Sequence, residues 1–407
     1  MNIPKIHNHF LSDKEGKRRL ALYWPWIYLR SGVERCIVEY LKRSRHDWTI
    51  LTNHFDKDAT YPEFAKFDVI ELSRVSVDRN PLKALKAAII ILFQKVDLSR
   101  FDALFLHSGD LGDLFAVRNR FIPVICYCHS PIRPVYDPTY REEYLKRNRG
   151  NALLFWVLWL TFRLIGPVAW GRYKFVFCNS HWIERRILIN RLCQHERLKV
   201  LHPGVDTTRI SPSNVWEHFF LVPGRIMWLK NIELAIRAFR IFRENSSATK
   251  QFQLIVAGMV DQKSRAYLKQ LQEQFGDIPD IRWVLNPSDK VLFSLYERCY
   301  AVLFTPLAED WGIVPLEAMA HGKPVVAVNR GGPTESIVPD KTGFLLPPDE
   351  KAFADTMLTL VQKRWLAEQM GFAGRKRVKA FDWEYYTKCL DDFFSQLPAR
   401  HPDLFLT

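Results

Sequence analysis

The chain alternates short apolar runs with helical patterns, and it does so twice over. The first set of runs ends near residue 201, and the second begins near residue 219, after a segment rich in Ser, Thr, Pro and Asn. Strand–helix alternation predicts parallel sheets with helices on both faces, so the expected fold class is α/β with two doubly wound, Rossmann-like domains facing across a cleft. The expected strands cover residues 19–24, 48–53, 104–107, 122–127, 175–178, 199–201, 219–222, 252–257, 281–284, 301–306, 324–328 and 343–346.

The length of the chain supports two domains. Its 407 residues exceed the size of a typical single domain, and a hydrophobic fraction of 48% can supply two cores. We expect a first domain over residues 1–210 and a second over residues 211–380. The seven cysteines are odd in number and lack metal-ligand spacing, which predicts reduced thiols in a cytosolic setting.

Two glutamates, Glu309 and Glu317, flank Gly312 and Pro315 after the predicted strand 301–306. This order predicts a loop at the carboxyl edge of the second sheet, followed by a helix from residue 316. Such an edge is where parallel sheets bind ligands. A glycine there lets a ligand approach the backbone, and the helix N-terminus offers free N–H groups. Two isolated glutamates are usually solvated, so further signals are needed.

Those signals are basic and glycine residues at other expected strand ends. Arg225 follows Gly224 after the strand 219–222, and Lys230 precedes a helix. Cations at this edge would stabilise negative charge on a leaving group. Gly32 begins the first predicted helix, where a backbone N–H can bind an anion. His129 follows the strand 122–127. Each residue alone has an ordinary structural interpretation, but together they indicate a ligand site in the cleft.

The segment from Glu309 to Glu317, EDWGIVPLE, resembles the donor-binding E-x7-E signature of retaining glycosyltransferases, in particular glycosyltransferase family 4. Nearly the whole chain shares this resemblance, in the expected order. The matching segments are 31–34 (SGVE), 128–131 (CHSP), 178–180 (CNS), 201–206 (LHPGVD), 220–231 (FLVPGRIMWLKN) and 331–335 (GGPTE). The resemblance implies the GT-B architecture, with a last helix, within residues 381–407, that packs back on the first domain.

The resemblance also implies roles. Glu317 would accept hydrogen bonds from the ribose hydroxyls, Glu309 would lie by the donor sugar, and His129 would reach that sugar from the first domain. The expected catalytic residues are His129, Arg225, Lys230 and Glu309. The expected donor-binding residues are Gly32, Asp310, Trp311, Gly312, Ile313 and Glu317, with the backbone N–H groups of residues 311–313 facing the sugar.

The implied reaction moves a hexose, mannose or glucose, from a nucleotide diphosphate sugar with retention of configuration. Glu309 could act as a covalent nucleophile, or the acceptor could attack from the face that the diphosphate leaves. We favour same-face attack, because Glu309 has no evident partner acid. No Asp-x-Asp lies near the cleft motifs, and Arg225 with Lys230 can supply a metal's positive charge. We therefore expect neither a metal nor another cofactor.

The partners are expected from the run 127–137 and from charge. That run resembles mannosyltransferases of surface-polysaccharide assembly, which favours GDP-mannose over UDP-glucose as the donor. A net charge of +14 indicates an anionic partner. The apolar segment 151–170 is interrupted by Arg163 and Pro167 and flanked by basic residues. It predicts either a helix in the membrane interface or a buried helix.

We therefore expect a glycan or lipid-linked acceptor, an anionic membrane surface, and a cytoplasmic enzyme peripheral to the inner face of the membrane. Residues 1–19 are polar and lack the apolar core of a signal peptide. Two other classes compete with this interpretation. One is a catalytically silent GT-B partner subunit. The other is a basic nucleic-acid-binding protein, which no recognised nucleic-acid module supports.

Overall fold

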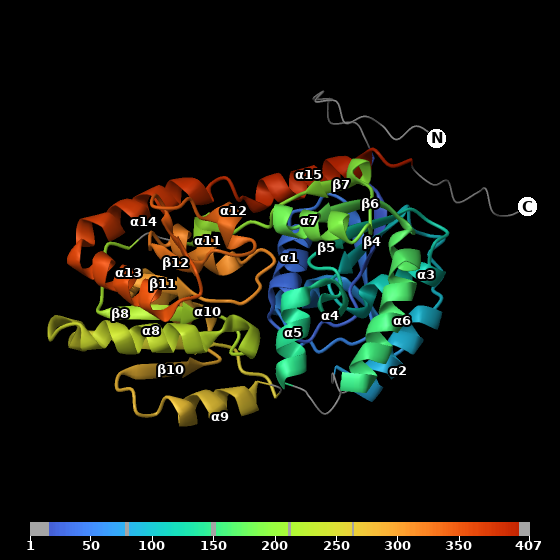
Figure 1. Ribbon diagram of the computed structural model, residues 1–407. Coiled ribbons are helices and arrows are strands. Elements are labelled where there is room, and N and C mark those ends of the chain that lie inside the picture. Colours follow the sequence, from blue (N-terminus) through green and yellow to red (C-terminus); the bar gives the residue numbers. More distant parts are fainter. Residues whose placement is uncertain (1–15, 78–80, 148–151, 211–212, 263, 399–407) are drawn as a thin grey trace, which may run out of the picture.

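The computed structural model describes residues 16–77, 81–147, 152–210, 213–262 and 264–398. They form two parallel sheets, with strand orders β3-β2-β1-β4-β5-β6-β7 and β10-β9-β8-β11-β12-β13 (Figure 1). The α/β class with two doubly wound sheets is confirmed. The strands are β1 (Arg19–Tyr23), β2 (Asp47–Thr52), β3 (Asp68–Glu71), β4 (Ala103–Ser108), β5 (Val124–Cys128), β6 (Tyr173–Cys178), β7 (Leu198–Val200), β8 (Phe219–Pro223), β9 (Gln253–Gly258), β10 (Ile281–Leu285), β11 (Ala301–Phe304), β12 (Val325–Val328) and β13 (Gly343–Leu346).

Helices cover both faces of each sheet. They are α1 (Gly32–Leu41), α2 (Pro81–Phe93), α3 (Phe115–Arg118), α4 (Arg133–Tyr136), α5 (Pro138–Arg147), α6 (Ala152–Trp170), α7 (His181–Ile189), α8 (Ile232–Glu244), α9 (Arg265–Gln274), α10 (Asp289–Arg298), α11 (Ile313–Ala320), α12 (Pro333–Ser336), α13 (Glu350–Gln362), α14 (Arg364–Val378) and α15 (Trp383–Ser395). A 3₁₀ turn, η6 (Trp228–Lys230), precedes α8.

The first sheet illustrates how strand periodicity fills two cores. Side chains alternate across a strand, so Ala21 and Tyr23 of β1 join one core while Leu20 and Leu22 join the other. Helices α2, α3, α6 and α7 cover the first of these faces. Helices α1 and α15 cover the second. The two faces therefore meet different parts of the chain.

Two local expectations are corrected. The helix after Trp311 begins at Ile313, not at residue 316, with Gly312 as its N-cap at φ +87°. Pro315 is tolerated because it lies in the first turn, where its missing N–H would have no helical partner. Glu317 consequently lies in the second turn of α11. Strand β3 was not expected, since it is a short edge strand with partly exposed residues.

The last described helix, α15, packs against the first sheet rather than the second, as Figure 1 shows. Tyr386, Leu390 and Phe394 are fully buried in that core. Asp391 accepts hydrogen bonds from the Tyr40 hydroxyl at 2.9 Å and from the Ser44 hydroxyl at 2.7 Å. The part of the expected terminal segment beyond residue 398 lies outside the described residues.

This packing predicts the effect of trimming α15. Phe394→Ala should lower the free energy of unfolding by about 3–5 kcal/mol, because it empties a closed apolar site. The matched control, Phe372→Ala, removes a side chain that is 62% exposed on α14 and should change stability by less than about 0.5 kcal/mol. Urea unfolding followed by circular dichroism measures both. Equal effects in the two variants would contradict this packing.

Candidate active site

A pocket lies where β8 and β11 end, at the carboxyl edge of the second sheet. Its lining includes Gly224, Arg225, Lys230 and Thr305. The Thr305 hydroxyl donates to the Lys230 carbonyl at 2.9 Å, and the Leu307 N–H donates to the Leu229 carbonyl at 2.9 Å. These bonds tie the loop after β11 to the loop after β8. The two cations expected from the sequence therefore line one pocket.

Glu309 lies next to this pocket. Its carboxylate pairs with the Lys230 ammonium group, and both side chains are largely shielded, at 17% and 25% exposed. An ion pair that is partly removed from water is held more firmly than a surface pair. The structure thus brings together Glu309 and Lys230, which lie 79 residues apart in the sequence.

Three glycines fix the shape of the loop that carries Glu309. A Cβ on Gly312 would lie 3.2 Å from Cγ of Glu309, and the positive φ of Gly312 strains any other residue. A Cβ on Gly331 would lie 2.0 Å from the Glu309 carbonyl oxygen, and one on Gly332 would lie 2.2 Å from that of Trp311. The turn at Gly331 and Gly332 therefore packs its backbone directly on the loop.

Asp310 points away from Glu309 into a buried ion cluster. This cluster lies between the half of the chain that forms the first sheet and the half that forms the second. Its carboxylate contacts Arg133 at 2.6 Å and Arg186 at 2.9 Å, and Arg186 also contacts Asp137 at 3.1 Å. Burial would raise the pKa of Asp310, but Arg133 and Arg186 outweigh it and hold the pKa below its usual range. The Asp310 side chain is therefore engaged by two guanidinium groups, and the donor-binding role expected for Asp310 stays a prediction.

Trp311 also serves the contact between the halves. Its side chain is 3% exposed, and its indole N–H donates to the Pro203 carbonyl at 3.1 Å. Its ring lies 4.4 Å from the ring of His202. The side chain is thus structural, and the backbone N–H groups of residues 311–313 are the part of this segment that remains suited to a ligand.

Glu317 and Gly32 lie on opposite sides of the cleft. The Tyr296 hydroxyl donates to Glu317 at 2.8 Å. Burial raises the pKa of Glu317, and Tyr296 and the more distant Arg35 offset that rise in part. A Cβ on Gly32 would lie 3.9 Å from Ile313 at the start of α11. The N-terminus of α1 therefore faces the N-terminus of α11.

Glu34, in the first turn of α1, is a buried carboxyl that the sequence pattern marked only as the last residue of the segment 31–34. Burial raises the pKa of Glu34 to about 7, although Ser31 and Arg225 act in the opposite direction. The Ser31 hydroxyl donates to this carboxylate and also caps α1 by accepting from the Val33 N–H. Glu34 thus couples the α1 N-terminus of the first half to Arg225 of the second.

His129 forms a buried pair with His107 at the ends of β5 and β4. Nδ1 of His107 lies 2.8 Å from Nε2 of His129, so one ring donates to the other. Burial lowers the pKa of His129 to about 3, despite the opposing charge of Asp310, and burial also places the pKa of His107 well below its ordinary value. Both rings are neutral near pH 7, so His129 can position a substrate but carries no charge.

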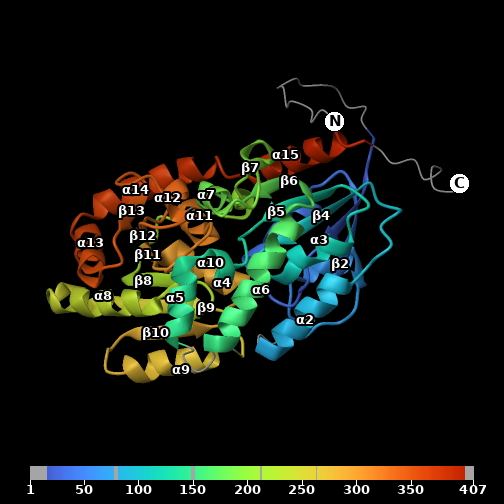
Figure 2. The ribbon, with the colours of Figure 1, turned by 45° about the vertical axis from the view of Figure 1, so that its right-hand side comes forward.

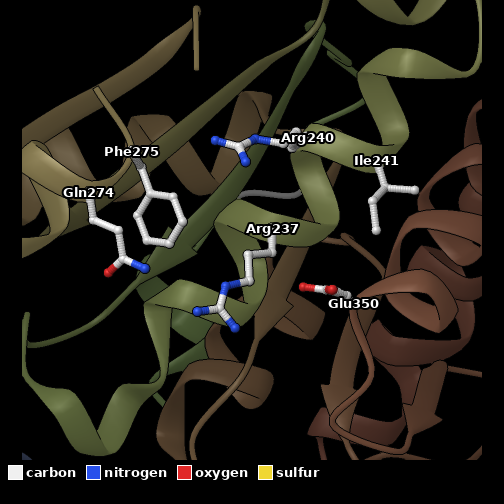
Figure 3. A pocket seen from close by; sticks show the side chains of 6 residues that line it. All are labelled: Arg237, Arg240, Ile241, Gln274, Phe275 and Glu350. Atoms are coloured by element: carbon white, nitrogen blue, oxygen red, sulfur yellow. The ribbon is translucent and has the colours of Figure 1, made fainter. Parts of the chain in front are cut away.

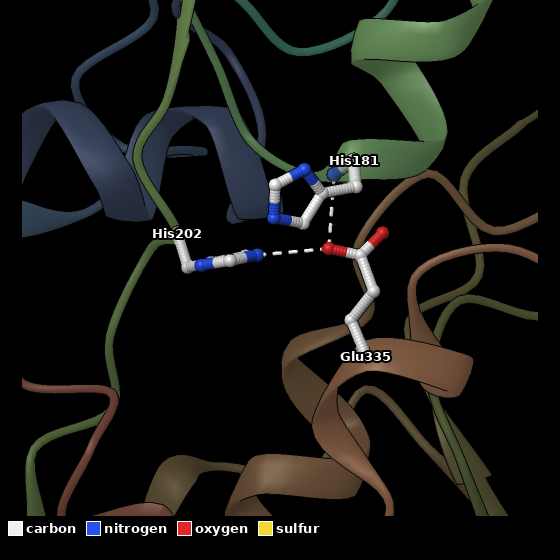
Figure 4. Close-up of side chains that lie close together, drawn as sticks. All are labelled: His181, His202 and Glu335. Atoms are coloured by element: carbon white, nitrogen blue, oxygen red, sulfur yellow. Dashed lines mark hydrogen bonds and ion pairs between the residues drawn. The ribbon is translucent and has the colours of Figure 1, made fainter.

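One group of three potential metal ligands occurs among the described residues, formed by His181, His202 and Glu335 (Figure 4). The Glu335 carboxylate accepts from His202 Nε2 at 2.8 Å and from the backbone N–H groups of His181 at 2.9 Å and Trp182 at 2.8 Å. It therefore caps α7. The positive end of that helix disfavours a cation, so we interpret this group as a cap that joins the halves.

A further pocket of about 260 Å³ lies between α8, α9 and α13 (Figure 3). Its lining consists of Arg237, Arg240, Ile241, Gln274, Phe275 and Glu350. Arg240 is already paired with Asp277 at 2.8 Å. Because its lining shares no residue with the predicted site, we assign this pocket no part in the reaction.

Comparison with known proteins identifies the class and then the family. By this fold and these residues the protein is a glycosyltransferase of GT-B architecture. Residues 207–377 match the profile described as glycosyl transferases group 1, and residues 30–209 match the profile described as Glycosyltransferase Family 4. The chain belongs to glycosyltransferase family 4.

Curated relatives are named as mannosyltransferases. The chain is 38% identical to human Alpha-1,3/1,6-mannosyltransferase ALG2 over 304 residues, which cover 70% of each chain. It is 32% identical to the Schizosaccharomyces pombe protein of the same name, over 91% of this chain and 79% of that one.

Solved structures share the fold. The Anabaena protein HepE, crystallised with UDP and glucose, matches with a TM-score of 0.70 at 18% identity, over 93% of this chain and 100% of that one. Sucrose-phosphate synthase from Thermosynechococcus elongatus matches with a TM-score of 0.72 at 18% identity, over 94% and 99%. At this level of identity the likeness shows the fold alone.

The buried histidine pair predicts sensitivity to acid. The folded-state pKa values lie below the ordinary 6.5, so the stabilisation is fully present above pH 6.5 and is lost as the pH falls toward about 3. His107→Leu removes one titrating group and should reduce this loss by up to about 1.4 kcal/mol per pH unit. Urea midpoints measured from pH 7 to pH 4 test this, with exposed His195→Gln as the control. Parallel curves for wild type and His107→Leu would contradict it.

Proposed function

We propose that this protein transfers mannose from GDP-mannose to a hydroxyl of a lipid-linked glycan, with retention of configuration. The observation that carries the proposal is the Lys230–Glu309 pair beside the pocket that Arg225 lines. The names of its relatives favour mannose over glucose. UDP-glucose is the second candidate donor.

The residues suggest how the reaction proceeds. Negative charge grows on the diphosphate as the sugar leaves, and Arg225 and Lys230 are placed to stabilise it. Glu309 is neutralised by Lys230, and an ion-paired carboxylate is a weak nucleophile. This supports attack by the acceptor from the face that the diphosphate leaves, with the departing phosphate as the base. Two cations also suit a reaction that needs no metal.

In this proposal each half of the chain binds a different substrate. We place the donor on residues 211–380, which carry Arg225, Lys230 and Glu317. We place the acceptor on the first half of the chain together with helix α15, which packs on the first sheet. Glu317 would bind the ribose hydroxyls, and Gly32 at the N-terminus of α1 would donate to the diphosphate. His129 would orient the sugar from the acceptor side as a neutral ring.

A thermal-shift panel tests the donor. GDP-mannose at 100 times its dissociation constant should stabilise the wild type by about 2.7 kcal/mol without added metal, because the ligand binds only the folded state. Glu317→Ala should lose this shift. Stabilisation by UDP-glucose and not by GDP-mannose would identify UDP-glucose as the donor. No stabilisation by any nucleotide sugar would favour the silent partner subunit.

The catalytic role of Lys230 has its own test. Lys230→Ala should lower kcat by about two to three orders of magnitude, because it removes a group that stabilises transition-state charge. Lys341→Ala, an exposed lysine on the loop after α12, is the matched control and should keep full activity. The measurement is kcat for mannose transfer by both variants and the wild type, without added metal. A Lys230→Ala enzyme with normal kcat would contradict the assignment.

We also propose that the protein docks peripherally on the cytoplasmic face of an anionic membrane. Helix α6 has an inner face, including Trp159, Phe162 and Ile165, that packs on the core. Its outer stripe is apolar yet exposed, through Leu153, Trp156, Val157, Leu160, Leu164 and Val168. Residues at this spacing share one helix face. The two interpretations of segment 151–170 therefore apply to opposite faces of one helix.

Helix α2 extends this surface. It lies beside α6 on the same face of the first sheet (Figures 1 and 2), and Leu82, Ile89 and Phe93 are 69%, 49% and 61% exposed. Basic groups border these exposed apolar side chains. Arg118 lies 5.7 Å from the Phe93 ring, and Lys95 lies 5.4 Å from the exposed Phe121 ring. Apolar side chains rimmed by cations suit an anionic bilayer surface.

No helix in the described part of the chain is long and apolar enough to cross a membrane. The proposed docking of α2 and α6 in the membrane interface is therefore tested by binding to vesicles. Leu160→Glu with Leu164→Glu should reduce co-sedimentation with vesicles containing anionic lipid at least tenfold, because two charges enter the apolar stripe. Phe372→Glu, on an exposed apolar residue of α14, should leave it unchanged. Equal binding of all three proteins would exclude this surface.

A further inference from the structure

A continuous row of aromatic rings joins the loop at Lys230 to the exposed face of α6. Successive ring centroids lie 5.3 Å apart for Trp228 and Tyr140, 6.1 Å for Tyr140 and Tyr144, 5.3 Å for Tyr144 and Phe155, and 5.7 Å for Phe155 and Trp156. These separations are within the range of favourable aromatic pairs. We call Trp228, Tyr140, Tyr144, Phe155 and Trp156 the aromatic row.

The two ends of the aromatic row have different surroundings. Trp228 belongs to the same 3₁₀ turn as Lys230, whose ammonium group pairs with Glu309. Trp156, at the other end, is 46% exposed in the outer stripe of α6. The row therefore runs from the proposed site of sugar transfer to the proposed membrane-docking surface. In Figure 1, α5 lies between α6 and the second half of the chain.

The middle of the row is accessible. Helix α5, which carries Tyr140 and Tyr144, has no buried residue. Both tyrosines are partly exposed, whereas the aromatic residues that support the sheets, such as Tyr127 and Tyr386, are fully buried. Part of each tyrosine side chain is therefore open to solvent.

Positive charge follows the same path. The Arg147 guanidinium lies 5.4 Å from the Trp228 ring, and that of Arg141 lies 5.9 Å from the Trp159 ring, which neighbours Trp156 at 5.5 Å. Acidic groups are present too, since Arg147 lies 3.9 Å from Glu233 and Lys146 lies 2.7 Å from Glu143. The cations nevertheless stand directly over the rings, where an anionic linker group could be bound.

We infer that Tyr140, Tyr144 and Trp228 form the binding track for the carbohydrate of the acceptor. Aromatic faces carry negative charge, and the C–H groups on one side of a hexose ring are slightly positive, so hexose rings stack on such faces. The lipid would stay at α2 and α6, while the glycan follows α5 until its terminal hydroxyl reaches Lys230 and Glu309. This inference rests on the proposed function, because it names the acceptor's path to that site.

The test compares acceptor and donor kinetics in variants of α5. Tyr140→Ala with Tyr144→Ala should raise the acceptor KM about 10- to 100-fold, since each ring contributes about three- to tenfold. The donor KM and kcat should stay within twofold of wild type. Tyr385→Ala, which removes a tyrosine that is 61% exposed on α15, is the matched control. Tyr144→Leu, which keeps apolar volume without a ring face, should raise the acceptor KM as well. Tyr144→Trp, which keeps an aromatic ring, should leave the acceptor KM near the wild-type value.

Two acceptor probes separate this track from the membrane surface. One is a mannose-terminated oligosaccharide on phytanyl diphosphate in detergent micelles, and the other is the same oligosaccharide without the lipid. The increase in KM should persist with the lipid-free probe, because the rings bind carbohydrate. The Leu160→Glu, Leu164→Glu variant should leave the KM for the lipid-free probe unchanged.

The outcomes distinguish the two proposals. A wild type that transfers neither mannose nor glucose to either probe would overturn the proposed function, and this inference with it. A wild type that transfers normally, beside α5 variants with an unchanged acceptor KM, would overturn this inference alone. A loss of kcat and donor affinity as large as the change in acceptor KM would also overturn it, since it would assign the rings a purely structural role.

Discussion

The arrangement of the site depends on the buried carboxylate of Asp310. An isolated carboxylate removed from water is strongly destabilising, so it is retained only where positive partners meet it. Here those partners are Arg133 and Arg186, which belong to the first half of the chain, while Asp310 belongs to the second. Folding the two halves together is therefore what makes this residue tolerable. In return, the ion cluster holds the loop of Glu309 against the segment that follows His129.

Neighbouring residues of that loop consequently face different parts of the molecule. Glu309 pairs with Lys230 in its own half, Asp310 pairs across to the first half, and Trp311 donates to the Pro203 carbonyl on the segment between the halves. The backbone of Gly331 and Gly332 packs on the loop so closely that a Cβ on either would overlap it. This close packing restricts the conformations that the loop can adopt. A carboxylate held this way needs no reorganisation before it meets a ligand, as the role proposed for Glu309 requires.

The first half combines two demands on the same helices. Helix α6 must bury an inner face to complete the core, yet its outer stripe is also apolar. Burial of the inner face stabilises the fold, and the exposed stripe gives no benefit to a chain surrounded by water alone. The basic residues near the stripe, and the aromatic row that leads from it, agree with the proposal that this face docks on a membrane that carries the acceptor.

Much of the fold and part of the site followed from the sequence alone. Strand–helix alternation, the E-x7-E spacing, the cations after Gly224 and the glycine turns are local patterns, and local propensity reports them directly. Asp310 and the backbone N–H groups of residues 311–313 were expected at the donor, because they lie within the motif, but a motif does not show which way each side chain turns. The start of α11 was misplaced because Pro315 suggests a break, whereas the structure uses it in the first turn.

Only the tertiary structure decided which distant residues meet. The His107–His129 pair, the electrostatic effect of Arg225 on Glu34, the bond between Arg186 and Asp310, and the aromatic row all join residues from separate elements. The sequence determined the strands, the turns and the residue types available at the sheet edges, because these depend on neighbouring residues. The pairing of buried charges and rings depends on how two complete sheets dock, and no local pattern encodes that geometry.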